Sequence, residues 1–194
     1  MLLIVLQILG GVFYLANKVF LALSESRKNK ETARKWRIAS WIVYLLGLAP
    51  WVILFIIKHN WIAASVETSG LPAMVLGLIL SLRGSTKSPP KWLDWIALFC
   101  IPMGLIYSIY DFNGLNTLTQ WLEILLVLGF LVGTYRLAKE KNDGYLWYML
   151  MHVACGWLML IENFPWLVAQ QTISILFIVY AYFLSRKKKW EPST

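Results

Sequence analysis

Long apolar runs alternate along this chain with short polar segments. The runs cover residues 2–23, 38–57, 61–82, 92–110, 118–138, 145–161 and 165–185. A helix needs roughly 20 apolar residues to cross the hydrocarbon core of a bilayer, and all the runs except the sixth approach or exceed that length. We therefore expect an all-α integral membrane protein with seven spans that form a single membrane domain over residues 1–194.

The basic residues separate these runs in a regular way. All but two of the 18 Lys and Arg residues fall in four clusters, at residues 27–37, 83–91, 136–141 and 186–189. Short loops rich in Lys and Arg remain cytoplasmic, so this pattern predicts the N-terminus outside and the C-terminus in the cytoplasm. The outer loops at 58–60, 111–116 and 162–163 are short and carry little charge.

The two exceptions are Lys18 and Lys58. Lys18 lies near the expected cytoplasmic end of the first span. A long lysine side chain at such a position can extend its ammonium group to the membrane surface. We therefore expect Lys18 to take no part in a site.

Composition supports a multi-pass membrane protein and changes the meaning of the charge. The chain is 59% hydrophobic, its mean hydropathy is +0.61 and its net charge is +8. In a soluble protein such a charge would suggest nucleic acid. Here the basic residues gather on one expected side of a membrane, where anionic lipid attracts them. We expect the lipid bilayer as a partner, no nucleic acid, and a bacterial inner (plasma) membrane as the location.

The first run could instead be a cleaved signal peptide, with cleavage near Ala22-Leu23-Ser24. That alternative is disfavoured because the run has no basic segment before it and its apolar stretch is too long.

Parts of the chain repeat. The third and seventh runs align without a gap, pairing Asn60 with Asn163, Glu67 with Gln170, Ser69 with Thr172 and Arg83 with Arg186. Leu-Gln-Ile-Leu from residue 6 likewise matches Leu-Glu-Ile-Leu from residue 122. The pattern predicts two three-helix repeats, at 1–83 and 118–186, in the same orientation. An odd linker helix at 92–110 is then required between them, as in transporters with parallel repeats.

This 3+1+3 layout, with an outside N-terminus and a small chain, resembles the SWEET/PQ-loop fold and its relatives, the PnuC family of vitamin transporters. The stretch Tyr145-Leu146-Trp147-Tyr148-Met149-Leu150 resembles the W-x-x-W pattern of PnuC proteins, with Leu150 at the second Trp position. No Pro-Gln pair ends the first span, where Asn17-Lys18 stands. The resemblance implies passage of a small hydrophilic metabolite, such as a vitamin, nucleoside or sugar, by alternating access between two three-helix bundles.

Four polar residues lie at one depth in the repeat-paired spans. Gln7, Glu67, Glu123 and Gln170 are five or six residues from the outer ends, or roughly 8–9 Å at 1.5 Å per residue. Polar groups inside a membrane are costly, so each is a candidate for function. We expect them to line an outward cavity for a small-molecule substrate. The alternative is a place at the headgroup boundary or in helix packing.

Further candidates lie deeper. His152 is near the midplane and either binds substrate or carries a proton, together with Glu67, or is a neutral histidine bonded to another helix. Aromatic faces suit a planar ligand, although packing and lipid contact are the commoner roles of intramembrane Trp. The complete expected substrate-binding set is Glu67, Thr68, His152, Gln170, Gln171, Trp51, Trp147, Gln7 and Glu123.

Motifs for chemistry are absent from the sequence. It has no P-loop, Rossmann glycine pattern, H-E-x-x-H or G-x-S-x-G. Cys100 and Cys155 lie within spans and far from metal-type spacing. We therefore expect no enzyme, cofactor or metal. Two alternatives to a passive transporter stay open: proton-coupled transport, and a non-transporting receptor or assembly subunit. Whether the chain forms a homo-oligomer is a separate open question. Gly70 and Pro72 are expected to interrupt the third span.

Overall fold

The computed structural model describes residues 1–84, 88–111, 116–161, 163 and 165–190. All regular elements in these residues are α-helices: α1 (Leu2–Ser26), α2 (Lys30–Ile57), α3 (Trp61–Arg83), α4 (Lys91–Asp111), α5 (Leu118–Ala138), α6 (Gly144–Ile161) and α7 (Pro165–Trp190). Each of the 7 helices has a stretch long and apolar enough to cross a membrane. This confirms the predicted class and the predicted number of spans. Most of the expected outer loops at 111–116 and 162–163 lies outside the described residues.

The predicted bounds differ most at α2, which begins at Lys30 instead of residue 38. The Asn29 side chain caps this helix by accepting hydrogen bonds from the backbone N–H groups of Glu31 and Thr32. One turn on, the Lys35 Nζ lies 2.9 Å from a Glu31 carboxylate oxygen. Capping and ion pairing thus extend the helix through polar residues that precede the apolar run. A hydropathy profile does not detect such an extension.

The expected interruption at Gly70 and Pro72 is wrong, because α3 is continuous through both residues. A membrane helix tolerates proline where neighbouring groups satisfy the freed carbonyl. Gly70 has a different role. A Cβ at this position would lie 2.5 Å from the Phe130 Cζ of α5, so glycine permits α3 to approach α5.

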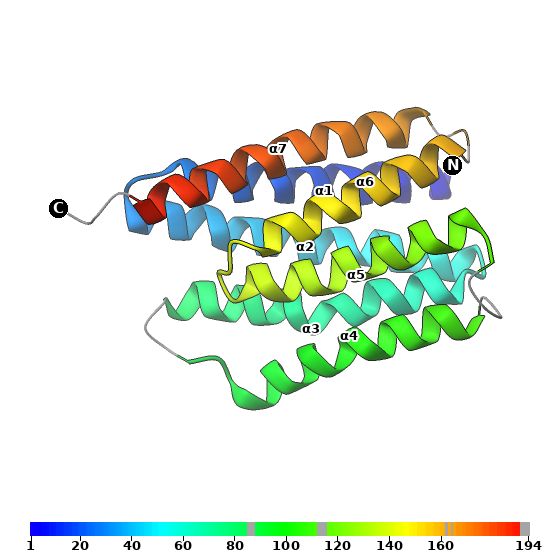
Figure 1. Cartoon of the computed structure of the whole chain (residues 1–194), viewed down its shortest axis with the longest axis horizontal. Coiled ribbons are helices and arrows are strands. Elements are labelled where there is room, and N and C mark those ends of the chain that lie inside the picture. Colours follow the sequence, from blue (N-terminus) through cyan, green and yellow to red (C-terminus); the bar gives the residue numbers. More distant parts are fainter. Residues whose placement is uncertain (85–87, 112–115, 162, 164, 191–194) are drawn as a thin grey trace.

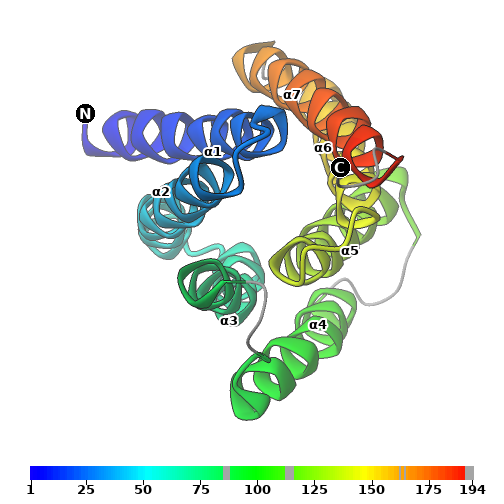
Figure 2. The same cartoon turned by 90° about the vertical axis from the view of Figure 1, so that its left-hand side faces the viewer.

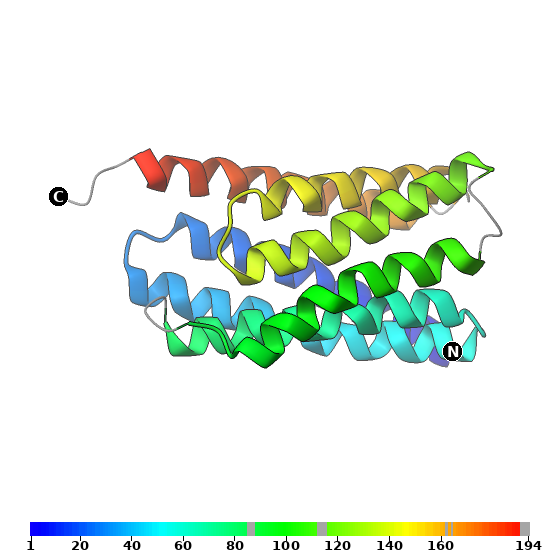
Figure 3. The same cartoon turned by 60° about the horizontal axis from the view of Figure 1, so that its bottom comes forward.

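The helices form two facing sets (Figures 1 and 2). In the first set, α1 packs on α2 and α2 on α3; in the second, α5 packs on α6 and α6 on α7. The sets meet along two edges, where α1 packs on α7 and α3 on α5. The seventh helix, α4, lies outside both sets against α3 and α5 (Figure 3). Among the described residues, the two middle helices α2 and α6 do not pack backbone to backbone.

The connections α1–α2, α3–α4 and α5–α6 lie at the same end of the molecule as the C-terminal end of α7, which we call the basic end (Figure 1). The N-terminus and the α2–α3 connection lie at the opposite end. Between the sets the core is rich in buried aromatic residues, including Tyr44, Phe130 and Tyr148. This interior holds the candidate site.

Candidate ligand site between the two helix sets

Lys18 lies in the interior of the bundle, with 1% of its surface exposed. Its Nζ is 4.4 Å from the ring centroid of Tyr44 and 4.5 Å from that of Tyr148. The expectation that Lys18 reaches the membrane surface is therefore wrong. The rotation of α1 places Asn17, Lys18 and Leu21 on the buried face of the helix. A hydropathy profile contains no information about that rotation.

One hydrogen bond and three aromatic rings hold the Lys18 ammonium. Lys18 Nζ donates to Asn17 Oδ1 over 2.9 Å, and Asn17 Nδ2 in turn donates to the Ser40 carbonyl oxygen of α2 over 2.9 Å. The Tyr14 ring is the third, at 5.8 Å. Ring faces attract a cation through their quadrupole. Among the described residues, no carboxylate forms an ion pair with Lys18.

Two tyrosines join the middle helices. The Tyr148 hydroxyl of α6 donates to the Tyr44 hydroxyl of α2 over 3.1 Å, and it lies 3.0 Å from the Thr134 Oγ1 of α5. Gly133 permits this placement, because a Cβ there would lie 2.5 Å from a Tyr148 ring carbon. The hydroxyl groups of the two tyrosines therefore bridge the space between α2 and α6.

Glu67 of α3 also lies at this interior. The Tyr14 hydroxyl donates to its Oε2 over 2.5 Å, linking α1 to α3. In the described part of the chain, Lys18 and Glu67 form no direct ion pair. The interior thus contains one acid and one base, each held by a different neighbour.

His152 of α6 is buried, with 5% of its surface exposed. Its Nδ1 lies 2.6 Å from the Gln171 Oε1 of α7, and its ring meets Tyr148 edge to face at 6.4 Å between centroids. Its Nε2 has no hydrogen-bond partner among the described residues. We call Tyr14, Lys18, Tyr44, Glu67, Tyr148 and His152 the central cluster.

Other predicted residues lie around this cluster or away from it. Trp51 packs beside Tyr14, with 6.3 Å between ring centroids, and its Nε1 has no partner among the described residues. Gln170 Nε2 donates to the Gly11 carbonyl oxygen over 3.2 Å, where α7 meets α1. Trp147 is half-buried and packs on Gly133 of α5.

Thr68, Gln7 and Glu123 complete the predicted set. Thr68 and Gln7 are exposed, and the Thr68 hydroxyl donates to the Ala64 carbonyl of its own helix over 2.7 Å. Glu123 is half-buried near the start of α5. Residues at equal depth along their helices therefore have different surroundings. Glu67 belongs to the central cluster, Gln170 lies in the contact between α7 and α1, and Gln7 is exposed.

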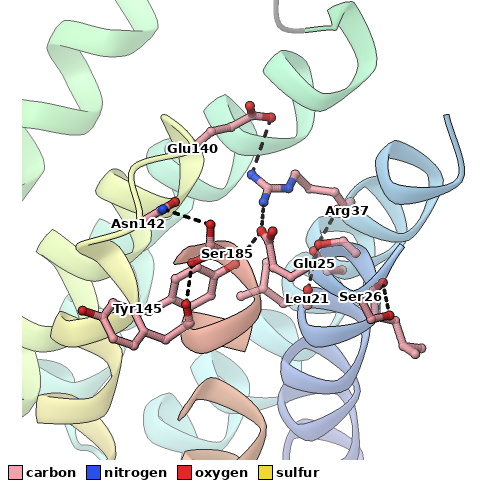
Figure 4. A network of polar contacts seen from close by, with 12 residues as sticks. Leu21, Glu25, Ser26, Arg37, Glu140, Asn142, Tyr145 and Ser185 are labelled. Atoms are coloured by element: carbon pink, nitrogen blue, oxygen red, sulfur yellow. Dashed lines mark hydrogen bonds and ion pairs between the residues drawn. The ribbon is translucent and has the colours of Figure 1, made fainter. Parts of the chain in front are cut away.

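A second polar network closes the basic end (Figure 4). Glu25 of α1 forms an ion pair with Arg37 of α2 and accepts a hydrogen bond from the Tyr145 hydroxyl of α6 over 2.8 Å. Arg37 Nη1 also lies 3.5 Å from the Oε1 of Glu140, a residue in the connection between α5 and α6. Asn142 Nδ2 donates to the Ser185 carbonyl oxygen of α7 over 3.4 Å. We call Glu25, Arg37, Glu140 and Tyr145 the end network.

An open pocket of about 650 Å³ lies over the end network and is lined by Glu25, Arg37, Arg136, Glu140, Lys141, Asn142, Asp143 and Ser185. Arg136 and Asp143 form an ion pair at this pocket. The Arg136 guanidinium holds the pKa of Asp143 below its usual range. The lining of the pocket contains both acidic and basic residues, so neither sign of charge dominates.

Sequence reasoning missed Lys18, its tyrosines and the end network. One signal was available, because Lys18 is the only Lys or Arg that lies well inside an expected span and outside the four clusters. Tyr44 and Tyr148 carried no signal, since buried tyrosines are common in any packed interior.

Comparison of the chain with models of protein families, with curated proteins and with solved structures gives no match.

Proposed function

We propose that this chain is a membrane transporter for a small hydrophilic metabolite, and that its two helix sets move against each other to expose the site alternately. The observation that carries the proposal is the central cluster. Charged and polar side chains from both sets meet inside an apolar bundle, where ionisable groups are costly and mark pathways for solutes. A hydrogen bond between two tyrosine hydroxyls links α2 to α6 there, so a modest separation of the sets would free the cluster.

The order of packing supports a 3+1+3 arrangement. Exchanging α1 with α5, α2 with α6 and α3 with α7 converts each packed pair of one set into a packed pair of the other. The same exchange converts the α1–α7 contact into the α5–α3 contact. In the proposal, α1–α3 and α5–α7 are parallel repeats and α4 is the linker, as in SWEET and PnuC proteins. The metabolite is then a vitamin, a nucleoside-like compound or a sugar.

The end network supports a state that is closed at one side. It joins both sets at the basic end, and the pocket above it ends on Glu25 and Arg37. In the proposal the basic end faces the cytoplasm of a cell whose plasma membrane, such as a bacterial inner membrane, holds the chain. Opening to the cytoplasm then requires Arg37 to release Glu140 and Glu25 to release Tyr145.

Two alternative functions are each favoured by one observation. Glu67 favours a proton-coupled version over a passive one, because carboxyl groups inside membrane bundles serve as proton carriers in pumps and transporters. The buried rings of Tyr44 and Tyr148 favour a receptor or assembly subunit that moves no solute, because they lie between α2 and α6 and bond to each other.

Uptake into proteoliposomes decides among these functions. Purified protein would be reconstituted and supplied with labelled vitamins, nucleosides and sugars, beside protein-free vesicles. Transport predicts saturable uptake of one class above the protein-free rate. A compound that raises the unfolding temperature but is not taken up would support the receptor, and the absence of uptake for every class would contradict the transporter.

A further inference from the structure

The Lys18 ammonium retains capacity to bind a further group. It has three N–H donors, and the structure assigns one of them to Asn17 Oδ1. The nearest acid of the cluster, Glu67, is engaged by the Tyr14 hydroxyl and lies beyond ion-pair distance of Lys18. A buried charge with no counter-ion in direct contact is costly, because the lost hydration is not replaced. A compensating anion is therefore the group that this position lacks.

The surroundings hold the cation without neutralising it. The ring centroids of Tyr44 and Tyr148 lie 4.4 and 4.5 Å from Lys18 Nζ, and such contacts stabilise an ammonium through the ring quadrupole. They leave its formal charge unbalanced. Asn17, tied to the Ser40 carbonyl, fixes the position of the ammonium against α2. Lys18 is thus preorganised for an anionic group.

The two rings belong to helices of opposite sets. Tyr44 lies on α2 and Tyr148 on α6, and their hydroxyls bond to each other. Movement of the sets in the proposed transport cycle would separate these rings and expose the Lys18 ammonium between them. The two rings stand at 87° with 6.5 Å between their centroids, so a planar ligand group entering there would meet the face of one ring and the edge of the other.

We propose that Lys18 binds a carboxylate of the transported metabolite, and that Tyr44 and Tyr148 flank the planar group that carries this carboxylate. The proposal rests on the proposed transport function. One cation balances one negative charge. A phosphate monoester carries about −1.5 to −2, which is more negative charge than one ammonium balances.

The test measures ligand-dependent unfolding of the purified full chain with three probes of similar shape: benzoate, benzamide and phenyl phosphate. We expect benzoate to raise the unfolding temperature more than the other two. Lys18→Met removes the charge at similar length, and we expect it to weaken benzoate binding at least tenfold. Lys58→Met is the matched control, because Lys58 is exposed at the opposite end.

Several results would overturn the proposal. These are an equal shift with benzamide, a larger shift with phenyl phosphate, or unchanged benzoate binding in Lys18→Met. If Lys18→Met does not fold, Lys18→Arg keeps the charge and must still prefer benzoate to benzamide. Uptake measurements test the transport function separately from the carboxylate site. Saturable uptake of neutral solutes only would support the transporter and refute the carboxylate site. Charge-selective binding without any uptake would refute the transporter alone.

Discussion

Lys18 and Glu67 place opposite charges in one interior without a direct ion pair. Each is held instead by a neutral partner: Lys18 by Asn17 and the tyrosine rings, and Glu67 by the Tyr14 hydroxyl. A direct pair would neutralise both groups and resist opening, since breaking a buried pair costs about 3–5 kcal/mol. The observed separation keeps both groups available to a ligand or a proton.

Glu67 provides the test of proton coupling. If the carboxyl carries the coupled proton, Glu67→Gln removes the dependence of uptake on a pH gradient, whatever rate remains. The measurement is uptake into proteoliposomes with and without an inward proton gradient. Uptake by Glu67→Gln that still responds to the gradient would contradict a coupling role for this carboxyl and leave the passive version.

Gly133 sets the distance between α5 and α6. A Cβ there would lie 2.5 Å from a Tyr148 ring carbon and 3.2 Å from the Trp147 Cβ, so Gly133→Ala forces the helices to shift. We expect destabilisation of about 1–3 kcal/mol, typical of an overpacked core, seen as a lower unfolding temperature in detergent.

Gly156→Ala is the control for this change. Its Cβ would meet the nearest atom, the Gln171 Cβ, at an ordinary 3.6 Å, and alanine favours a helix by about 1 kcal/mol. The unfolding temperature should stay the same or rise. Equal losses in the two variants would contradict the steric explanation for Gly133.

At the scale of helices, side-chain contacts near the basic end determine which elements stay together. The α4 helix is attached to α5 there, because Asp94 accepts hydrogen bonds from Lys139 Nζ over 2.8 Å and from the Tyr135 hydroxyl over 2.9 Å. Burial opposes the charge of Lys139, but its hydrogen bonds to Asp94 and to the Tyr135 hydroxyl outweigh this effect and raise the pKa of Lys139. The lysine side of this attachment is therefore intact at neutral pH and is lost as the pH rises to strongly alkaline values.

The end network predicts a gate that Arg37 holds closed. Arg37→Gln removes the ion pairs with Glu25 and Glu140. Without these pairs the closed end should open more often. Ser185 lines the pocket but is buried, so Ser185→Cys, in a background without the two native cysteines, reports this opening. We expect maleimide labelling to accelerate roughly tenfold, equivalent to about 1.4 kcal/mol.

Lys35→Gln is the matched control on the same helix. Lys35 pairs with Glu31 on an exposed surface, where such a pair contributes about 0.3–0.5 kcal/mol. Labelling should therefore not change. A similar acceleration in both variants, or none in Arg37→Gln, would argue against a gate.

For the whole molecule, the basic clusters predict the direction of insertion. A green fluorescent protein fused after α7 should fluoresce in a bacterial host, because that end is expected in the cytoplasm. Alkaline phosphatase inserted at residues 58–60 should be active, because that loop is expected outside. The reverse result for both reporters would mean an inverted protein and would move the end network to the outer side.

The sequence by itself determined the class, the number of spans and most helix bounds of this protein, because hydropathy over 20 residues is a local property. Depth along each helix followed from the same count. Only the tertiary structure decided which way each helix is turned. That rotation buries Lys18, exposes Gln7, and brings Tyr44 and Tyr148, 104 residues apart, into one cluster. The physical reason is that helix rotation is selected by packing between distant segments, such as Tyr148 on Gly133, which no single span encodes.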